Sequence, residues 1–287
     1  AKHIPLPPRR TKLRSIMTAL ILVSCLLAAS TDSAAQDSKQ NMIESLEPAD
    51  ILAVFAHPDD ETFATGTFTK LSANGKRIQL VYATSGDAGG DRTGQGLEGD
   101  ALARHRESEM IQASRILNVS AEPLFLRYPD GFVRDNWDSI LTDVESIMRQ
   151  TQAQIVVTFG PDGYYGHRDH LAISQIAEHA FDGLGIASNL LHVAIPRSLN
   201  DLIVQAGGGS RYSPVEDKYI TYIVNVRGQI EQRVAAMQAH ASQFDEQTIG
   251  QMQILGAVTG IEGFVEVRNL GESGTLSTIF TEGDEED

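Results

Sequence analysis

Two short clusters of histidine and carboxylate side chains carry the residue types that bind metal ions and transfer protons. In the first cluster His57 and Asp60 lie three residues apart around a turn, and in the second His167 and His170 have the same spacing. A catalytic zinc site takes three imidazole or carboxylate ligands and leaves one position for water. Two histidines and one carboxylate also describe the facial triad of non-haem iron enzymes. The clusters therefore predict one divalent metal site that fits Zn2+ and does not exclude Fe2+.

The first cluster follows a segment typical of a buried strand. Residues 51–56 are apolar, with β-branched and aromatic members. Pro58 lacks a backbone N–H and disfavours helical geometry at His57, so the strand ends there. Residues 62–73 are typical of a helix with acidic residues at its positive end. This places the cluster at the carboxyl end of a strand, where open parallel sheets bind ligands. The alternative interpretation is an acidic helix cap beside a surface histidine.

The second cluster has the same surroundings. It follows a buried strand and a tight turn, and a helix comes after it. Strands alternate with helices along the rest of the chain, which requires right-handed crossovers between parallel strands. We therefore expect an α/β fold, a Rossmann-like mostly parallel sheet flanked by helices, with a small C-terminal strand extension. The expected strands are 51–56, 77–83, 124–126, 154–159, 191–195 and 219–226, with weaker ones at 264–267 and 278–280, and the expected helices are 62–73, 101–117, 136–150, 171–181 and 229–242.

The N-terminal segment has the pattern of an export signal. Basic residues precede an apolar run over residues 16–29, and Ser33-Ala34-Ala35 is a small-residue cleavage signal. The apolar run is too short to span a bilayer comfortably. A lipoprotein signal with Cys25 as the modified residue is the alternative, although the apolar run continues past that cysteine. We expect an exported protein, periplasmic or extracellular. The expected segments are a signal peptide over 1–35, a flexible lead-in over 36–47, a single domain over 48–281 and an acidic tail over 282–287.

The composition excludes several classes of partner. The chain has 287 residues and a formal net charge of −15, which becomes −19 when the five basic residues and one acidic residue of segment 1–35 are removed. An acidic surface argues against nucleic acid and anionic membranes as partners. Cys25 is the only cysteine, so disulfides and thiolate chemistry are not expected after cleavage. The sequence carries no information on oligomeric state.

Several motifs in order along the chain resemble one known family. Ala56 to Glu61 reads AHPDDE, and Gly166 to His170 reads GHRDH. Arg106 and Glu109 form an R-x-x-E element, Tyr128 to Gly131 reads YPDG, and Ala239 to Gln243 reads AHASQ. Over residues 48–245 the chain resembles the LmbE/PIG-L-like zinc deacetylases, which remove acetyl from N-acetylglucosamine conjugates. The resemblance implies a metal-dependent hydrolase and a small-molecule or glycan substrate that bears an N-acetyl group.

The resemblance also implies a role for each matching residue. His57, Asp60 and His170 would be the metal ligands, and Asp59 the general base that takes a proton from the attacking water. His167 would be a cation that stabilises the oxyanion. Further implied roles belong to Asp169, which would orient His167, to Tyr165, which would approach the oxyanion, and to Arg106 and Asp130, which would bind the substrate.

Simpler interpretations accompany some of these roles. Asp169 could cap the helix that follows it, and Arg106 with Glu109 could be a solvated helix pair. Asp130 lies in a turn that favours aspartate in any case. The sequence departs from the commonest family motif at Arg168, where proline is usual, and at Asn118, where glycine is usual. Neither departure removes an expected ligand.

Three other functions remain open from the sequence. The first is amidase action on a larger acyl group, which the loops over 84–100 and 198–212 would decide. The second is a catalytically silent sugar-binding protein on the same scaffold, although such a protein has no need of a base. The third is an iron oxygenase of the facial-triad type.

Overall fold

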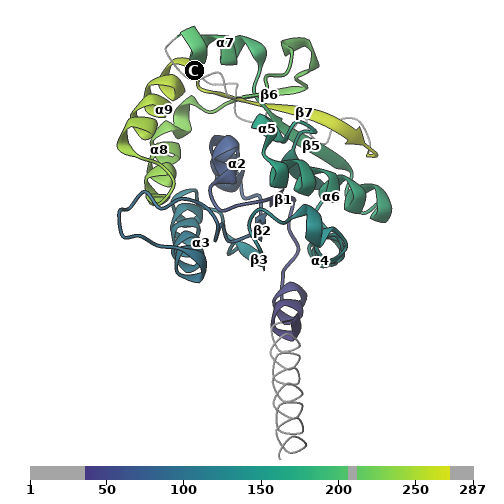
Figure 1. Ribbon diagram of the computed structural model, residues 1–287. Helices are drawn as coiled ribbons and strands as arrows, with labels where there is room; N and C mark the ends of the chain where they lie inside the picture. The colour runs from purple at the N-terminus through teal and green to yellow at the C-terminus, as the bar shows by residue number, and fades with distance from the viewer. Residues whose placement is uncertain (1–35, 206–211, 272–287) are drawn as a thin grey trace, which may run out of the picture. The chain divides into compact units, whose positions relative to one another are not determined.

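The computed structural model describes residues 36–205 and 212–271 (Figure 1). These residues belong to two units, which divide between Ser45 and Leu46. In the first unit residues 36–44 are helical, and Gln40 Nε2 donates a hydrogen bond to Glu44 Oε1 at 2.8 Å. The sequence predicts a flexible lead-in for this segment instead, because a polar composition gives no apolar helical pattern. Polar side chains four residues apart can nevertheless interact on a helix. The expected signal peptide, residues 1–35, lies outside the described residues.

The second unit is built on one twisted sheet. The described residues contribute seven strands in the order β3-β2-β1-β4-β5-β7-β6. β1 to β5 are parallel, whereas β7 runs antiparallel to β5 and β6 antiparallel to β7. The predicted mostly parallel sheet with a small C-terminal extension is therefore confirmed. The strands are β1 Ile51–Phe55, β2 Ile78–Thr84, β3 Leu124–Tyr128, β4 Ile155–Phe159, β5 Asn189–Ala194, β6 Tyr222–Asn225 and β7 Ile261–Asn269.

Helices cover both faces of the sheet (Figure 1). α2 Thr65–Ala73 and α3 Gly99–Ile116 both contact α8 Ile230–Ala239, while α4 Trp137–Thr151 packs against α6 Arg168–Leu184. Right-handed crossovers place α2 and α3 on one face and α4 and α6 on the other, because strand order reverses after β3. Among the described helices none has the length and apolarity needed to cross a membrane. The remaining helical elements are η1 Asp60–Phe63, η2 Arg134–Asn136, α5 Gly163–Gly166, α7 Arg197–Gln205, η3 Asp217–Tyr219, η4 Arg227–Gln229 and α9 Glu246–Thr259.

The strand order locates the place where a ligand is expected. β1 lies between β2 and β4, and the chain reaches these neighbours in opposite directions along the sheet. In open α/β sheets ligands bind beside the carboxyl ends of the two strands at this reversal. The first motif cluster follows β1 and the second follows β4. The topology therefore brings together two segments that are more than a hundred residues apart in sequence.

The C-terminal strands are tied to the helix that follows the first cluster. Glu262 of β7 is buried, and its carboxylate accepts hydrogen bonds from the backbone N–H groups of Gly66 and Thr67 at 2.9 and 2.8 Å. These N–H groups open α2, whose own preceding residue provides no side-chain cap. A carboxylate at the positive end of a helix satisfies orphan donors and complements the helix dipole. The antiparallel extension is thus part of the support for α2.

The fit of α2 against the segment after β6 gives a testable prediction. A Cβ atom built on Gly66 would lie 2.6 Å from Val226 Cβ, a rigid branched neighbour. We expect Gly66→Ala to lower the free energy of unfolding by about 1–3 kcal/mol because of overpacking, measured by urea denaturation. Gly250→Ala is the matched control, because Gly250 lies in α9 with no atom within 4 Å of the added Cβ. There the gain in helix propensity should raise stability by up to about 1 kcal/mol. Equal effects at the two positions would contradict the close packing.

Candidate active site

Three side chains converge where β1 and β4 end. His57 Nδ1 lies 3.3 Å from His170 Nε2, which lies 3.1 Å from Asp60 Oδ1, and His57 Nδ1 lies 3.6 Å from Asp60 Oδ2. Metal–ligand bonds of about 2.0–2.2 Å in a tetrahedral arrangement place donor atoms roughly 3.3–3.6 Å apart. All three side chains are largely buried. The donor types suit a divalent ion, although Asp60 meets the two imidazoles with different oxygens. Among the described residues, the groups whose ligand atoms all lie within 4.8 Å of one another are His57 with His167 and His170, and His57 with Asp130 and Asp169.

The imidazoles are held so that their free nitrogens face one another. His57 Nε2 lies 3.0 Å from Asp130 Oδ1 and 3.4 Å from Asp169 Oδ2, so this nitrogen carries the proton and Nδ1 is left as a donor for a metal. His170 Nδ1 lies 3.1 Å from the carbonyl oxygen of Gly163, which leaves Nε2 free in the same way. The ring of His170 also stacks on Phe159, with centroids 4.0 Å apart. Each ligand is thus fixed in both tautomer and orientation.

Asp60 is held as a carboxylate. Its Oδ2 accepts hydrogen bonds from the backbone N–H groups of Ala56 and His57, at 3.1 and 2.8 Å. Burial raises the pKa of Asp60, but His170 and His57 outweigh it and bring this pKa well below its usual range. For His57 burial lowers the pKa, and hydrogen bonds to Asp130, Asp169 and Asp60 raise it above its ordinary value. The group therefore collects anionic oxygens around positions suited to a cation.

Asp59 stands beside these ligands in an unusual backbone conformation. Its φ is +110°, a value that L-residues rarely adopt. Its side chain is 21% exposed, and its Oδ1 lies 3.3 Å from Arg106 Nη2. Enclosure by the protein raises the pKa of Asp59 to about 6, although Arg106 lowers it. Asp59 is thus a partly exposed carboxylate whose pKa lies near neutrality, as suits a general base.

The structure uses Arg106 differently from the substrate contact implied by the motif. The side chain is buried, and its guanidinium donates to the carbonyl oxygens of Pro58 and Gly86 at 2.5 and 3.3 Å. A Cβ atom on Gly86 would lie 2.1 Å from Arg106 Nη1, and Gly86 also has φ +70°. Only glycine therefore allows this approach. Arg106 holds the turn that contains Asp59 against the glycine-rich loop, and it does not pair with Glu109 as an exposed helix pair would.

Asp130 and Asp169 both contact His57. Asp130 meets His57 as described above, and its other oxygen accepts from the backbone N–H of Ala88 at 3.3 Å. The Asp169 carboxylate accepts from the backbone N–H groups of Gly131 and Val133, at 2.6 and 3.4 Å, and is directed to His57. It does not cap its own helix. Both carboxylates therefore support a candidate metal ligand, because the YPDG turn packs against the start of α6.

His167 lies next to the candidate ligands, and among the residues that the structure describes no carboxylate pairs with it. Its ring centroid is 4.9 Å from that of His57 and 4.8 Å from that of His170. The backbone N–H of Asp169 donates to His167 Nδ1 at 3.3 Å, so the ring proton of the neutral form lies on Nε2. Burial, and then the charges of His57 and His170, lower the pKa of His167. Asp169 raises the pKa of His167, but less than these effects lower it, and the Asp169 carboxylate is hydrogen-bonded to Gly131 and Val133 and not to His167.

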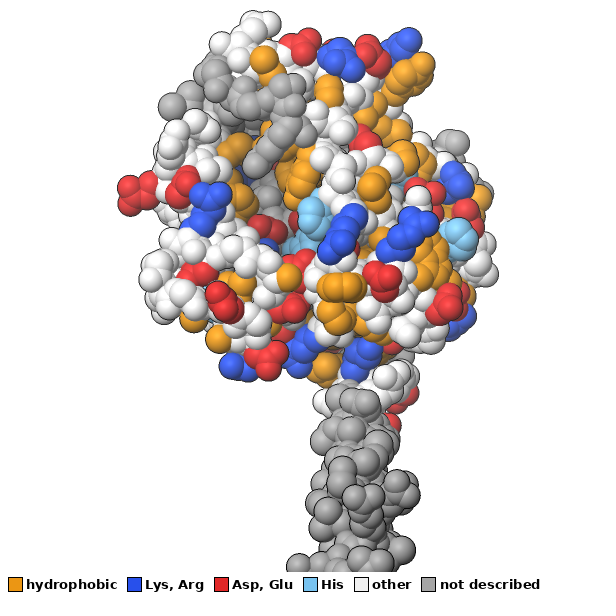
Figure 2. Space-filling model, viewed as in Figure 1, with side chains coloured by type: hydrophobic (Ala, Val, Ile, Leu, Met, Phe, Trp, Pro, Cys, Tyr) orange, Lys and Arg blue, Asp and Glu red, His pale blue; other side chains and the backbone are white. Residues whose placement is uncertain are grey.

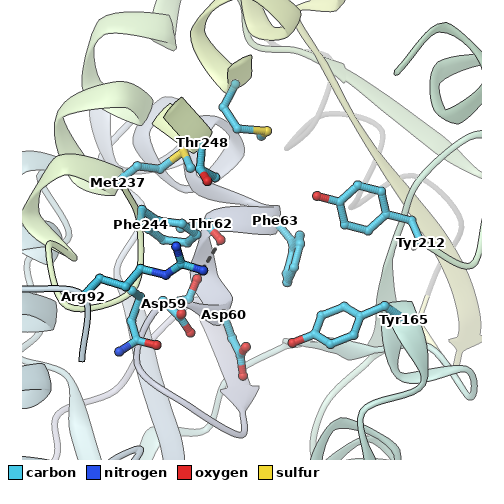
Figure 3. A pocket seen from close by; sticks show the side chains of 12 residues that line it. Asp59, Asp60, Thr62, Phe63, Arg92, Tyr165, Tyr212, Met237, Phe244 and Thr248 are labelled. Carbon is cyan, nitrogen blue, oxygen red and sulfur yellow. Dashed lines mark hydrogen bonds between the residues drawn. The ribbon is translucent and has the colours of Figure 1, made fainter. Parts of the chain in front are cut away.

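A cleft of about 230 Å³ opens beside Asp59 and Asp60. Figure 2 shows histidine side chains at the floor of a hollow in this face of the molecule. Much of the lining is apolar and aromatic, and Met237 and Phe244 lie on the opposite side of the cleft from Tyr165 and Tyr212 (Figure 3). Tyr165 is 39% exposed and directs its hydroxyl into the cleft, with its ring 4.9 Å from that of His170. The apolar and aromatic lining residues are Phe63, Tyr165, Tyr212, Met237, Phe244 and Met252.

The second loop expected to shape the site, residues 198–212, is only partly a loop. Residues 198–205 belong to α7, and residues 206–211 lie outside the described residues.

Sequence reasoning missed the contacts of the AHASQ segment. His240 Nε2 lies 2.7 Å from Glu61 Oε1, and both side chains are fully buried. Ser242 donates through its N–H and hydroxyl to Glu109, at 2.8 and 2.6 Å, and Gln243 Nε2 donates to Gly90 O at 3.0 Å. The motif resemblance was the only signal available for this segment. The segment connects the turn after β1, helix α3 and the glycine-rich loop.

Comparisons with known proteins agree with the site. A family model described as GlcNAc-PI de-N-acetylase (PIG-L) matches residues 52–181. A 1D-myo-inositol 2-acetamido-2-deoxy-alpha-D-glucopyranoside deacetylase of Kineococcus radiotolerans is 30% identical over 251 residues, which cover 69% of each chain. The enzyme of the same name from Acidothermus cellulolyticus is 29% identical over 231 residues, 67% of this chain and 79% of the relative.

Solved structures share the fold at lower identity. N,N'-diacetylchitobiose deacetylase from Pyrococcus horikoshii has a TM-score of 0.59 and 21% identity, covering 83% of this chain and 92% of its own. GalB, the 4-carboxy-2-hydroxymuconate hydratase of Pseudomonas putida, has a TM-score of 0.58 and 17% identity, covering 77% and 96%. These neighbours establish the fold alone. The match to the family model and the identity to the Kineococcus enzyme go further and confirm the motif resemblance: the chain belongs to the GlcNAc-PI de-N-acetylase (PIG-L) family.

Proposed function

We propose that this protein is a zinc-dependent N-deacetylase, which hydrolyses the acetamide of an N-acetylglucosamine-type sugar or conjugate. The observation that carries the proposal is the convergence of His57, Asp60 and His170 beside the partly exposed carboxylate of Asp59. Family membership supports it, since the relatives named above are deacetylases of acetamido sugars. Two imidazoles and one carboxylate favour Zn2+, with Fe2+ as the alternative.

The residues of the chain divide the work of hydrolysis. A divalent ion held by His57, Asp60 and His170 would polarise the scissile carbonyl and lower the pKa of a water molecule. Asp59, held by Arg106, takes a proton from the attacking water. It then returns that proton to the leaving amine, since a base of this kind serves as the acid of the second step.

Two side chains beside the ligands complete this assignment. His167 donates a hydrogen bond from Nε2 to the oxyanion, which requires no carboxylate behind the ring. Tyr165 contributes its hydroxyl from the wall of the cleft. Asp130 and Asp169 keep the proton of His57 on Nε2 and so preserve its donor nitrogen.

A direct assay tests the reaction. Purified protein with its metal content measured is incubated with N-acetylglucosamine, N,N'-diacetylchitobiose and a series of N-acylglucosamines of increasing chain length, and free amine and carboxylic acid are quantified. Acetate release in equal yield with free amine, independent of oxygen, is the expected result. A preference for longer acyl groups would favour the amidase alternative, oxygen dependence the oxygenase, and binding without product the silent sugar-binding protein.

Replacement of Asp59 separates catalysis from metal binding. Asn is the appropriate substitute because it tolerates positive φ better than Ala. We expect Asp59→Asn to lower kcat by a factor of about 10² or more, since general-base catalysis contributes 10²–10⁴-fold, while metal stoichiometry stays that of the wild type. Metal content and turnover are measured on the same preparation. Wild-type turnover in this variant would remove Asp59 as the base.

The ligands and their supporting carboxylates predict graded losses of metal. We expect His57→Ala to abolish stoichiometric binding, whereas Asp130→Asn should weaken metal affinity by about 10–100-fold, because the carboxylate fixes the tautomer and basicity of His57. Competition with a chelator measures both affinities. Asp91→Asn is the control, since Asp91 hydrogen-bonds only within the glycine-rich loop. Unchanged affinity in Asp130→Asn with a raised KM would restore the substrate-binding role implied by the motif.

We also propose that the protein meets its substrate outside the cytoplasm. The basis is the residue pattern of segment 1–35, with a basic start, an apolar run and a small-residue cleavage signal. Extracellular N-acetylated glycans or cell-wall fragments would then be the substrate class. Fractionation of a bacterial host that expresses the chain should place the protein in the periplasm or medium, with an N-terminus at Gln36. An uncleaved protein in the cytosol would contradict export, and a lipid on Cys25 would favour the lipoprotein alternative.

A further inference from the structure

We infer that His240 is a positioning residue for Asp59 and acts through Glu61; this rests on the proposed function. Glu61 follows the two functional aspartates but is fully buried, away from the cleft. Its Oε1 meets His240 Nε2 at 2.7 Å. Its Oε2 accepts hydrogen bonds from the backbone N–H of Asp59 and from the Tyr82 hydroxyl, both at 3.1 Å. One carboxylate therefore links a residue of the distant α8 segment to the backbone of the general base.

The backbone of Asp59 needs such support because its conformation is intrinsically unfavourable. At φ +110° and ψ −15° the residue lies outside the regions that a non-glycine residue populates readily. The Glu61 carboxylate holds its N–H, and the Thr62 hydroxyl donates to its carbonyl oxygen at 2.6 Å. Thr62 is a local contact, whereas the position of Glu61 depends on a residue 179 positions away. In this conformation the Asp59 carboxylate lies 3.3 Å from Arg106 and lines the cleft beside Asp60.

The buried pair of His240 and Glu61 is not explained by a contribution to stability. Buried ion pairs contribute little to stability in comparison with apolar residues of similar volume. Within the described part of the chain His240 Nδ1 is buried and has no hydrogen-bond partner, so Nε2 alone carries the hydrogen bond of this ring. What the pair does achieve is a fixed Glu61 carboxylate directly behind Asp59. The geometry therefore fits a role in orientation.

Two nearly isosteric substitutions in the full metal-loaded enzyme test this role. His240→Gln keeps an N–H donor for Glu61, and His240→Met has the same length without a donor. We expect His240→Met to lower kcat by about 10–100-fold, the range found for residues that orient functional groups, with KM within twofold of the wild-type value and metal content unchanged. His240→Gln should recover most of the lost kcat. Equal kcat in Met and wild type, equal losses in Met and Gln, or loss of metal in Met would overturn the inference.

A second buried histidine provides the control. His192 of β5 is 5% exposed, and its Nε2 lies 3.1 Å from Glu178, at a place with no contact to Asp59. His192→Met should lower thermal stability about as much as His240→Met and leave kcat unchanged. A comparable loss of kcat in both variants would show that any disruption of a buried histidine impairs the enzyme, and would overturn the specific role of His240.

A double-mutant cycle separates this inference from the proposed function. If His240 acts only through Asp59, Asp59→Asn and Asp59→Asn/His240→Met should have the same residual rate, whereas multiplied losses would overturn the inference. Absence of acetate release by the wild type, or full turnover by Asp59→Asn, would remove the proposed function and the inference with it. If His240→Met has full turnover while Asp59→Asn is inactive, the inference about His240 is overturned and the proposed function stands.

A milder variant serves if His240→Met does not fold. Tyr82→Phe removes only the hydroxyl that donates to the same Glu61 oxygen that Asp59 uses. Loss of one such hydrogen bond should lower kcat by about 2- to 10-fold with KM unchanged. Unchanged kcat in Tyr82→Phe would then contradict the proposed positioning.

Discussion

The site depends on one constraint, the close approach of three metal-binding side chains from two segments that are distant in the sequence. Nitrogen and oxygen atoms of His57, Asp60 and His170 lie within 3.1–3.6 Å of one another, with a different Asp60 oxygen near each imidazole. Such an arrangement is suited to a cation and depends on a second set of contacts that prevents the side chains from turning away. Those contacts come from Asp130 and Asp169 for His57, from Gly163 for His170, and from backbone N–H groups for Asp60. The ligand set is therefore preorganised by its surroundings.

The candidate site lies at the ends of β1 and β4. The turn that follows β1 is held in place by C-terminal elements. Glu262 of β7 holds the first turn of α2, and His240 at the end of α8 holds Glu61. The turn after β1 and the start of α2 are therefore both held by residues about two hundred positions further along the chain. The antiparallel extension adds strands to one edge of a parallel sheet. Through Glu262 it also helps to hold the helix that follows the candidate site residues.

Features that depend on short stretches of residues could be predicted from the sequence. Buried strands of continuous apolar character and the two motif clusters could be placed within a few residues, and the crossover rule then brought the clusters together. Helices α7 and α9 were not predicted, because the apolar and glycine-containing stretch of α9 has no clear periodicity. The partners of Arg106, Asp130 and Asp169 could not be derived either. Motif spacing gives the position of a side chain on its element, whereas its direction depends on loops from elsewhere, such as the YPDG turn.

Structural neighbours show that this scaffold does not determine one reaction, since a hydratase shares it with the deacetylases. The distinction must therefore reside in the residues of each site. Here the turn after β1 has a positive φ at Asp59 alone, and this residue is also one of the two carboxylates that line the cleft. A conformation that opposes folding persists only when surrounding contacts impose it. Arg106, Glu61 and Thr62 impose it here from three directions, so the chemistry follows from how this one residue is held.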